Sequence, residues 1–148
     1  MFTDFMGQFE HTIDEKGRMT IPASFRERLT EGAFITQGFA QNLMIFPAEP
    51  FERLAEQVIN LNLADPNART LRQMLFSRAS RLEFDKAGRI LIPQFLRQNI
   101  QINGAAVVVG MGTYFEIWPP QEWSKQEAEL RNTEANTHRF SPLQLTGL

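Results

Sequence analysis

The sequence contains no cysteine among its 148 residues. This absence excludes disulfides, thiolate catalysis and cysteine-ligated zinc, and it fits a reducing compartment. No run of eighteen or more apolar residues occurs, so no transmembrane helix is predicted. The first residues, Met1-Phe2-Thr3-Asp4, lack the basic region followed by an apolar one that a secretory signal needs. We therefore expect a soluble protein of the cytoplasm with no membrane partner.

Residues that support catalysis are also scarce. The two histidines, His11 and His138, lie far apart in the sequence, so a histidine relay or a multi-histidine metal site is not easily assembled. Asp14 and Asp85 could form a carboxylate pair, but their neighbours indicate backbone-capping roles in turns. The glycines occur singly and match no phosphate-binding fingerprint. We expect no enzyme, no cofactor, no metal site and no small-molecule substrate.

Charge is unevenly distributed along the chain. The formal net charge is −2, but residues 67–103 hold seven cations against two anions, a local balance of +5. The cations are Arg69, Arg72, Arg78, Arg81, Lys86, Arg89 and Arg97, and the anions are Glu83 and Asp85. Such clustering can produce a basic face on a mildly acidic protein. The alternative is that these charges are spread over solvated helix surfaces.

A nine-residue motif occurs twice. Asp14–Pro22 reads DEKGRMTIP and Asp85–Pro93 reads DKAGRILIP, an offset of 85 − 14 = 71 residues. Further matches follow at an offset of 72 (Gly32 with Gly104, Gly38 with Gly110, Phe46-Pro47 with Trp118-Pro119, Phe51 with Trp123). Because half of this length would make only a marginal core, the repeat indicates one compact unit built from two related halves.

Each motif predicts a tight turn followed by an arginine. Asp14 and Asp85 can cap the turn backbone, and Gly17 and Gly88 can take the positive φ that a hairpin connection needs. Arg18 and Arg89 are the candidate DNA-binding residues, because the guanidinium fork suits phosphate oxygens or the edge of guanine. Lys16 and Lys86 are neighbouring candidates at different turn positions. The alternative is that each arginine only pairs with the aspartate of its own turn.

Hydrophobic periodicity and proline positions predict the remaining elements. We expect strands at 8–13, 19–21, 33–37 and 42–46, extended structure at 77–84, and helices at 23–29, 51–63 and from Trp123 to about Arg131. Asp65 is the expected N-cap of a further helix that has Pro66 at its first position. Trp118 and Trp123 are expected to pack in the core. Residues 132–148 are polar and without period, which predicts a poorly ordered tail.

The doubled Asp-x-x-Gly-Arg-x-x-x-Pro motif, Phe46-Pro47, Trp118-Pro119 and the segment from Asp65 through Ala79 resemble the MraZ family. That family regulates the bacterial division and cell-wall gene cluster through two modules of the SpoVT/AbrB-like type. The resemblance implies an α+β fold, a pseudo-two-fold swapped-hairpin (double-split) β-barrel of two βαββ-type repeats with peripheral helices. It divides the chain into a first module with its trailing helix (1–66), a linker helix (67–78), a second module with its trailing helix (79–131) and a flexible tail (132–148). The two modules would form one compact domain.

The same resemblance implies a sequence-specific transcriptional regulator that associates with the nucleoid. It implies binding to short repeated double-stranded DNA sites in the promoter of its own operon, and assembly into a ring-shaped homo-oligomer. The family's DNA-contacting arginines correspond to Arg18 and Arg89, with Lys16 and Lys86 beside them. Two alternatives stay open: an AbrB-like antitoxin or transition-state regulator, and an oligomeric scaffold that binds no DNA.

Overall fold

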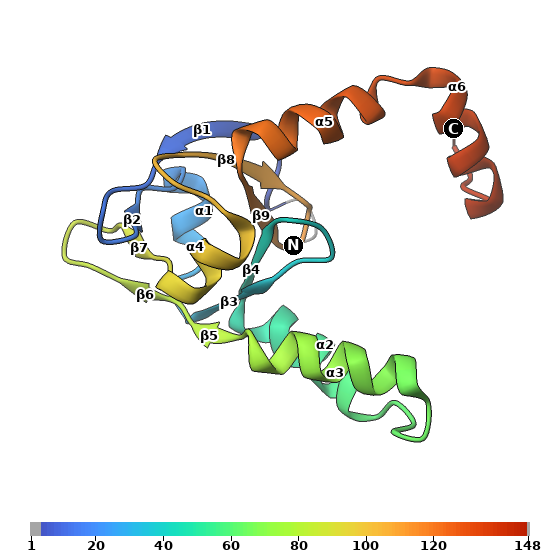
Figure 1. The fold of residues 1–148 in the computed structure, drawn as a ribbon, viewed down its shortest axis with the longest axis horizontal. Coiled ribbons are helices and arrows are strands. Elements are labelled where there is room, and N and C mark those ends of the chain that lie inside the picture. The colour runs from blue at the N-terminus through green and yellow to red at the C-terminus, as the bar shows by residue number, and fades with distance from the viewer. Residues whose placement is uncertain (1–3, 148) are drawn as a thin grey trace.

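The computed structural model describes residues 4–147, so residues 1–3 of the predicted first module and Leu148 of the predicted tail lie outside the described residues. Within that range the elements follow one order twice (Figure 1). The first half comprises β1 (Gln8–Thr12), β2 (Arg18–Met19), α1 (Ala23–Glu27), β3 (Ala33–Gln37), β4 (Leu43–Pro47) and α2 (Ala48–Ile59). The second comprises β6 (Glu83–Phe84), β7 (Ile90–Leu91), α4 (Gln94–Ile100), β8 (Ala105–Gly110), β9 (Phe115–Trp118) and α5 (Pro120–Leu130). Helix α3 (Pro66–Ser77) and β5 (Ser80–Arg81) join the halves, and α6 (Thr133–Phe140) and a 3-10 turn (Ser141–Leu143) follow α5.

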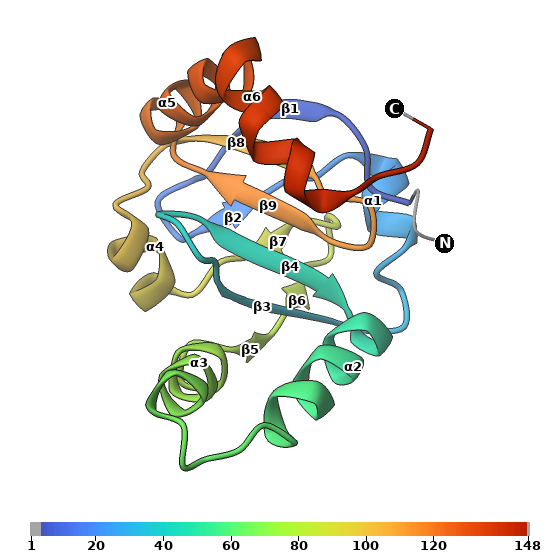
Figure 2. The ribbon, with the colours of Figure 1, turned by 90° about the vertical axis from the view of Figure 1, so that its right-hand side faces the viewer.

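The strands of residues 4–147 form two antiparallel sheets in which the halves pair with each other. The larger sheet has the order β1-β8-β9-β4-β3-β5, and the smaller has the order β2-β7-β6. Strand β1 of the first half pairs with β8 of the second, and β4 pairs with β9. Figure 2 shows β9 and β4 side by side near the middle of the larger sheet. Neither half therefore has a complete sheet of its own.

The strand register places equivalent residues of the repeat opposite each other. Met19 faces Ile90 in the smaller sheet, and the two are 71 residues apart. Met44 faces Glu116 in the larger sheet, at the offset of 72 that holds in that part of the repeat. In an antiparallel pair, two equivalent residues that face each other are related by a local two-fold rotation. The repeat in the sequence is thus a two-fold relation in space.

Successive side chains along the strands of the larger sheet point to opposite faces, and both faces of the central strands β4 and β8 are buried. Ile35, Ile45, Val108 and Ile117 are fully buried in the main core, which also takes in residues of α1 and α4. The opposite face of the sheet is covered at two places. Met44 and Phe46 pack with Phe51, Val58 and Leu75 of α2 and α3. Val107 and Val109 pack with Trp118 and Trp123 under α5, which confirms the core role predicted for both tryptophans.

The predicted α+β class is confirmed, but the hydrogen-bonded strands of residues 4–147 do not close into a barrel. Strands β2, β6 and β7 are two residues long. The smaller sheet is joined to β1 only through the isolated bridge between Ile13 and Met19 among the described residues. Pro22 and Pro93 lie at the N-caps of α1 and α4 and have no N–H to extend a ladder, so both strands give way to helices.

The observed helix boundaries follow capping residues and prolines close to the start of each helix. Helix α3 begins as expected, with Pro66 at its first position and the Asp65 side chain accepting a hydrogen bond from the Asn67 N–H. Helix α2 begins at Ala48, three residues before the predicted start, directly after Pro47. The prediction of a poorly ordered tail from Asn132 is wrong for 133–140, which form α6. The Asn132 side chain accepts a hydrogen bond from the Ala135 N–H and caps that helix, a signal that apolar periodicity does not report.

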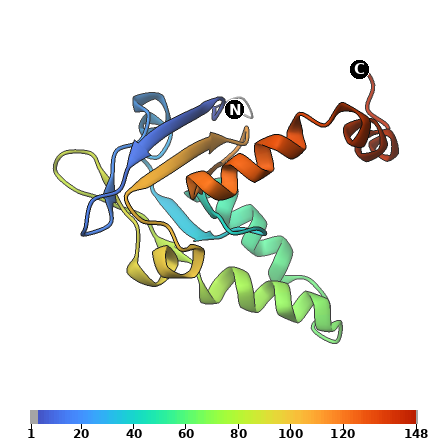
Figure 3. The ribbon, with the colours of Figure 1, turned by 45° about the horizontal axis from the view of Figure 1, so that its top comes forward.

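The turns and the peripheral helices lie at opposite ends of the molecule. In Figures 1 and 3 the β1–β2 and β6–β7 turns extend to one side, while α2, α3, α5 and α6 project on the other. The α2–α3 hairpin and the α5–α6 segment form two separate projections in both views. Among residues 4–147, no helix has the length and apolarity needed to cross a membrane.

Candidate nucleic-acid interface

The two predicted turns have the same hydrogen bonds. In the first, Gly17 N–H donates to the Asp14 carbonyl at 3.0 Å and Asp14 N–H donates to the Arg18 carbonyl at 3.0 Å. The Asp14 Oδ1 atom accepts from the Lys16 and Arg18 N–H groups, both at 2.9 Å. Asp85 repeats this arrangement in the second turn, accepting from the Ala87 and Arg89 N–H groups at 2.9 Å. Each aspartate side chain therefore accepts hydrogen bonds from the backbone of its own turn.

Both turn glycines have a backbone conformation that favours glycine, and Gly17 also lies against backbone of the other half. Gly17 has φ +87° and Gly88 has φ +78°, in the region that favours glycine. A Cβ on Gly17 would also lie 2.7 Å from both the Ile92 carbonyl oxygen and the Arg97 Nε atom. A Cβ on Gly88 would lie 3.0 Å from the Nη1 atom of Arg26. Each turn therefore packs against an arginine from the helix of the other half.

Each turn arginine is paired with the aspartate of its own turn. The Nε atoms of Arg18 and Arg89 donate to Oδ2 of Asp14 and Asp85, respectively, at 2.7 Å. This is the pairing that the sequence left open as an alternative to DNA contact. The arginine side chains remain about one third exposed, at 34% and 33%. The pairing thus orients the guanidinium groups without enclosing them.

Hydrogen bonding lowers the pKa of both turn carboxylates. The backbone N–H of Arg18 makes the largest contribution to lowering the pKa of Asp14, and the N–H of Arg89 does the same for the pKa of Asp85. Partial burial opposes the shift, and the guanidinium hydrogen bonds reinforce it. Both aspartates are accordingly held as carboxylates, which keeps their arginines oriented.

Strand pairing brings the two arginines to one surface. Because β2 pairs with β7, Arg18 lies opposite Leu91, two residues beyond Arg89. Arg89 Nη1 approaches Asp14 Oδ2 of the other turn at 3.8 Å. Both arginines line a depression of about 370 Å³. Its remaining lining residues are Glu10, His11, Thr12, Asp14, Met19 and Thr20.

His11 lies at the edge of this depression rather than in a catalytic arrangement. Its Nδ1 atom is 3.1 Å from the Thr20 hydroxyl, and partial burial lowers its pKa. Lys16 and Lys86 are exposed in their turns and do not line the depression. The structure therefore brings Arg18 and Arg89 together and leaves the two lysines outside that pair.

Two arginines near the turns were missed by the reasoning from sequence. Arg26 of α1 and Arg97 of α4 lie against Gly88 and Gly17, respectively. The Arg97 Nε atom also donates to the Ile92 carbonyl at 3.1 Å. The repeat in the sequence could have identified both residues, because Arg26 and Arg97 each lie four residues after the proline of their motif, Pro22 and Pro93.

Comparison with known proteins gives the family. The model of the family described as "MraZ protein, putative antitoxin-like" matches twice, at residues 5–74 and 75–143. The two matches together span nearly the whole chain and divide it near the end of α3. The chain belongs to the MraZ family.

Similar proteins from several bacteria carry the name of the family. The chain is 49% identical over 137 residues to the Transcriptional regulator MraZ of Roseiflexus castenholzii, covering 93% of this chain and 94% of that protein. It is 47% identical over 119 residues to the protein of the same name from Herpetosiphon aurantiacus, covering 80% and 83%. For that of Leuconostoc mesenteroides the identity is 40% over 125 residues, covering 84% and 87%. The resemblance read from the doubled motif is thereby confirmed, including its repeat.

Proposed function

We propose that this MraZ-family chain is a sequence-specific DNA-binding transcriptional regulator without catalytic activity. The observation that carries the proposal is the placement of two arginine-bearing turns with the same hydrogen-bond pattern side by side, with both guanidinium groups lining one surface depression. The names of its relatives support the regulatory role. The chain would work in the cytoplasm, associated with the nucleoid.

The geometry suggests how the turns would contact DNA. Each aspartate holds its arginine through Nε, and the terminal Nη groups can donate to phosphate oxygens or to the O6 and N7 atoms of guanine. Fixing a guanidinium before binding lowers the entropy cost of each contact. Lys16 and Lys86, exposed in the same turns, would add phosphate contacts that strengthen binding without reading sequence.

One copy presents few cations at this surface, so its binding to DNA would be weak and sensitive to salt. We propose that the chain forms a ring-shaped homo-oligomer that repeats the surface at fixed spacing. Several short repeated sites in the promoter of its own operon would then engage several copies together. Occupation of those sites would change the access of RNA polymerase to the promoter.

The exchange of strands between halves supports a swapped-hairpin arrangement as the framework of this surface. In the pairs β1–β8 and β2–β7, a strand of one half completes the sheet of the other. Strand exchange, rather than the peripheral helices, would therefore place the two turns at one end of the molecule.

A gel-shift titration with a promoter fragment tests the role of the turns. Arg18→Ala and Arg89→Ala should each weaken binding by about 1–3 kcal/mol, roughly 5- to 150-fold, while circular dichroism shows an unchanged fold. Arg53→Ala is the matched control, since Arg53 also pairs with an acid four residues away, Glu49, but lies on α2. Binding that survives both turn substitutions undiminished would reject the proposed interface.

The scaffold alternative makes a different prediction for the wild-type chain. A scaffold would show no salt-dependent DNA binding in a fluorescence titration, whereas the proposed regulator would lose affinity steeply as salt rises.

A further inference from the structure

A pocket of about 460 Å³, here called the Glu116 pocket, lies between helix α5, strand β9 and the loops that follow β3 and β8. It shares no lining residue with the depression between the turns. Its lining includes three aromatic side chains, a carboxylate and an amide, from Phe39, Trp118, Trp123, Glu116 and Asn42. An apolar hollow with a few polar groups is typical of a site for a small molecule.

Glu116 is the one charged side chain among the residues of 4–147 that line the pocket. It forms no ion pair within the described part of the chain. Its Oε1 atom accepts a hydrogen bond from Trp118 Nε1 at 2.9 Å, and the Asn42 side chain makes a second hydrogen bond to the carboxylate. Because a carboxylate has about four acceptor positions and both donors are neutral, a cationic donor would complete the site.

The surroundings of Glu116 leave its charge poorly compensated. Burial raises the pKa of Glu116, and the hydrogen bonds from Trp118 and Asn42 oppose this rise with smaller effects. A cation beside the carboxylate would stabilise the charged form and lower the pKa again. The pocket therefore favours a positively charged ligand over a neutral one of the same shape.

The aromatic side chains provide a second attraction for cations, because the face of an aromatic ring is electrically negative. Trp118 and Trp123 are buried and pack together, with their ring centroids 5.5 Å apart. Phe39 is 72% exposed, which leaves its ring available to a ligand. Met111 and Leu130, which also line the pocket, are about half exposed, at 45% and 50%. These two side chains suit an apolar stem attached to the cation.

The repeat provides an internal comparison. A depression of about 320 Å³ in the first half is lined by Met44 and Phe46, which occupy the positions of Glu116 and Trp118 at the offset of 72. Arg53 lines it as well, and no carboxylate does among the residues that the structure describes. The joint presence of a carboxylate and tryptophans is therefore a property of the second half and not of the repeat in general.

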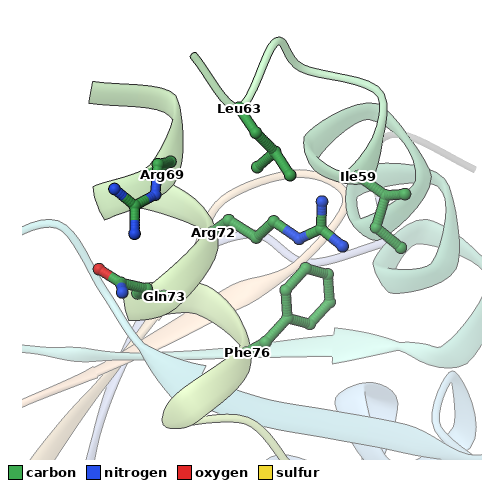
Figure 4. A pocket seen from close by; sticks show the side chains of 6 residues that line it. All are labelled: Ile59, Leu63, Arg69, Arg72, Gln73 and Phe76. Carbon is green, nitrogen blue, oxygen red and sulfur yellow. The ribbon is translucent and has the colours of Figure 1, made fainter. Parts of the chain in front are cut away.

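The groove between α2 and α3 has a similar volume, about 440 Å³, and the opposite charge (Figure 4). Arg69 and Arg72 line it, and Figure 4 shows Arg72 extending across the groove toward Ile59. None of its lining residues within 4–147 is acidic. A cationic ligand would be repelled there, so charge distinguishes the Glu116 pocket from a hollow of the same size.

We propose that the Glu116 pocket binds a small organic cation, an ammonium or guanidinium group carried on a short apolar stem. The cationic group would bind the carboxylate of Glu116 beside the aromatic rings, and the stem would lie against Met111 and Leu130. A guanidinium group can donate two parallel hydrogen bonds to a carboxylate, whereas an ammonium group acts as a compact charge. The inference does not depend on DNA binding by the turns.

Tryptophan fluorescence of the full chain reports on this pocket, since both tryptophans of the sequence, Trp118 and Trp123, line it. At constant ionic strength, n-butylammonium and n-butylguanidinium should each give a saturable change. Sodium butyrate and 1-butanol, which share the stem but lack the positive charge, should not. Isothermal titration calorimetry detects binding that leaves the fluorescence unchanged. The inference is overturned when neither cation binds saturably by either method, or when 1-butanol binds as tightly as the cations.

Glu116→Gln tests the carboxylate, because it keeps the side-chain volume and an acceptor for the Trp118 N–H but removes the charge. It should weaken the binding of both cations roughly 10- to 100-fold. Glu122→Gln is the matched control, since it removes a charge from α5, but Glu122 pairs with Lys125 and does not line the pocket. The control should retain wild-type affinity. Equal cation affinity in Glu116→Gln and wild type would reject the site.

Two further measurements do not require Glu116→Gln to fold. The affinity of the wild type for the cations should fall as the pH drops through the pKa of Glu116, because protonation removes the carboxylate charge. Since burial raises that pKa, the fall should begin at a higher pH than for an exposed glutamate. Phe39→Ala, at an exposed position, should weaken cation binding roughly 2- to 5-fold. An affinity that stays constant between about pH 8 and pH 4 would contradict the role of Glu116.

Discussion

At the scale of single residues, Asp14 and Asp85 each bind two backbone N–H groups and one guanidinium group. One carboxylate thus fixes both the path of the turn and the direction of its arginine. Substitution of either aspartate would therefore change turn stability and arginine orientation together, and the two effects need separate measurements.

The lowered pKa values predict a loss of stability in acid. Since the folded carboxylates bind protons less readily than the unfolded ones, their contribution is complete above the unfolded pKa, about 3.9. It is lost as the pH falls through the lower folded values. Urea unfolding of wild type between pH 5 and pH 2 should show this decline, and Asp14→Asn/Asp85→Asn should reduce its steepness.

Added salt distinguishes two possible causes of that decline, the backbone hydrogen bonds and the charges of the arginines. Backbone hydrogen bonds make the largest contribution to the pKa shifts, and they are less sensitive to ionic screening than an exposed ion pair. The acid-dependent loss should therefore persist in about 1 M salt, where the Debye length is about 3 Å. Its disappearance in salt would assign the shift to the arginine charges instead.

Gly17 offers a comparison of backbone strain with steric contact. Gly17→Ala and Gly104→Ala both place alanine at positive φ, +87° and +80°. Each substitution should lower the free energy of unfolding by about 1–2 kcal/mol through backbone strain alone. Nothing lies within 4 Å of a Cβ on Gly104, whereas a Cβ on Gly17 meets the Ile92 carbonyl oxygen. Gly17→Ala should lose a further ~1–3 kcal/mol in urea unfolding. Equal losses would show that the turn relaxes around the added methyl group.

At the scale of elements, a buried hydroxyl ties the α2–α3 hairpin to the larger sheet. Thr36 of β3 is fully buried and donates to the Leu75 carbonyl near the end of α3 at 2.9 Å. This hydrogen bond therefore helps to fix how the hairpin projects from the body of the molecule.

Thr36→Val should destabilise the protein by about 1–3 kcal/mol, because the buried carbonyl loses its donor while side-chain volume is retained. Thr30→Val is the matched control, since Thr30 is exposed and its hydroxyl lies 3.4 Å from the Glu27 carbonyl. The control should remain within about 0.5 kcal/mol of wild type. Thermal unfolding of the two variants measures the difference in their stability. Similar losses would show that the Thr36–Leu75 hydrogen bond does not stabilise the protein.

At the scale of the whole molecule, the turns occupy one end and the projecting helices the other. This separation would leave the proposed DNA-binding turns accessible if the projecting helices contact a partner. In the ring proposed above, the affinity for DNA would depend on the number of sites engaged at once.

Deleting one of several repeated DNA sites should therefore reduce affinity far more than in proportion to the number of sites removed. A fluorescence titration against promoter fragments with successive deletions measures this dependence. A variant that native mass spectrometry shows to be monomeric should show only the proportional loss. A proportional loss in the wild type as well would reject avidity.

The success of the reasoning from sequence depended on how local each feature is. The turn at Asp14–Arg18, the N-cap Asp65 and the core positions of the two tryptophans were predicted, because each follows from neighbouring residues or from the repeat. Helix α6 was missed because it is defined by a cap and by local hydrogen bonds rather than by an apolar face. The swapped-hairpin barrel stays a prediction, since it depends on pairing between distant strands, and the strands of residues 4–147 form two sheets that do not close into one barrel.

The sequence by itself determined two turns with an aspartate, a glycine and an arginine, since those contacts join residues at most four apart. Only the tertiary structure decided that Arg18 and Arg89 share one surface and that Arg26 and Arg97 cross to the opposite turns. These placements depend on the register of β2 against β7, whose partners lie about 70 residues apart. Such a register is set by burial summed over both halves, with Met19 and Ile90 fully enclosed at the two-fold position.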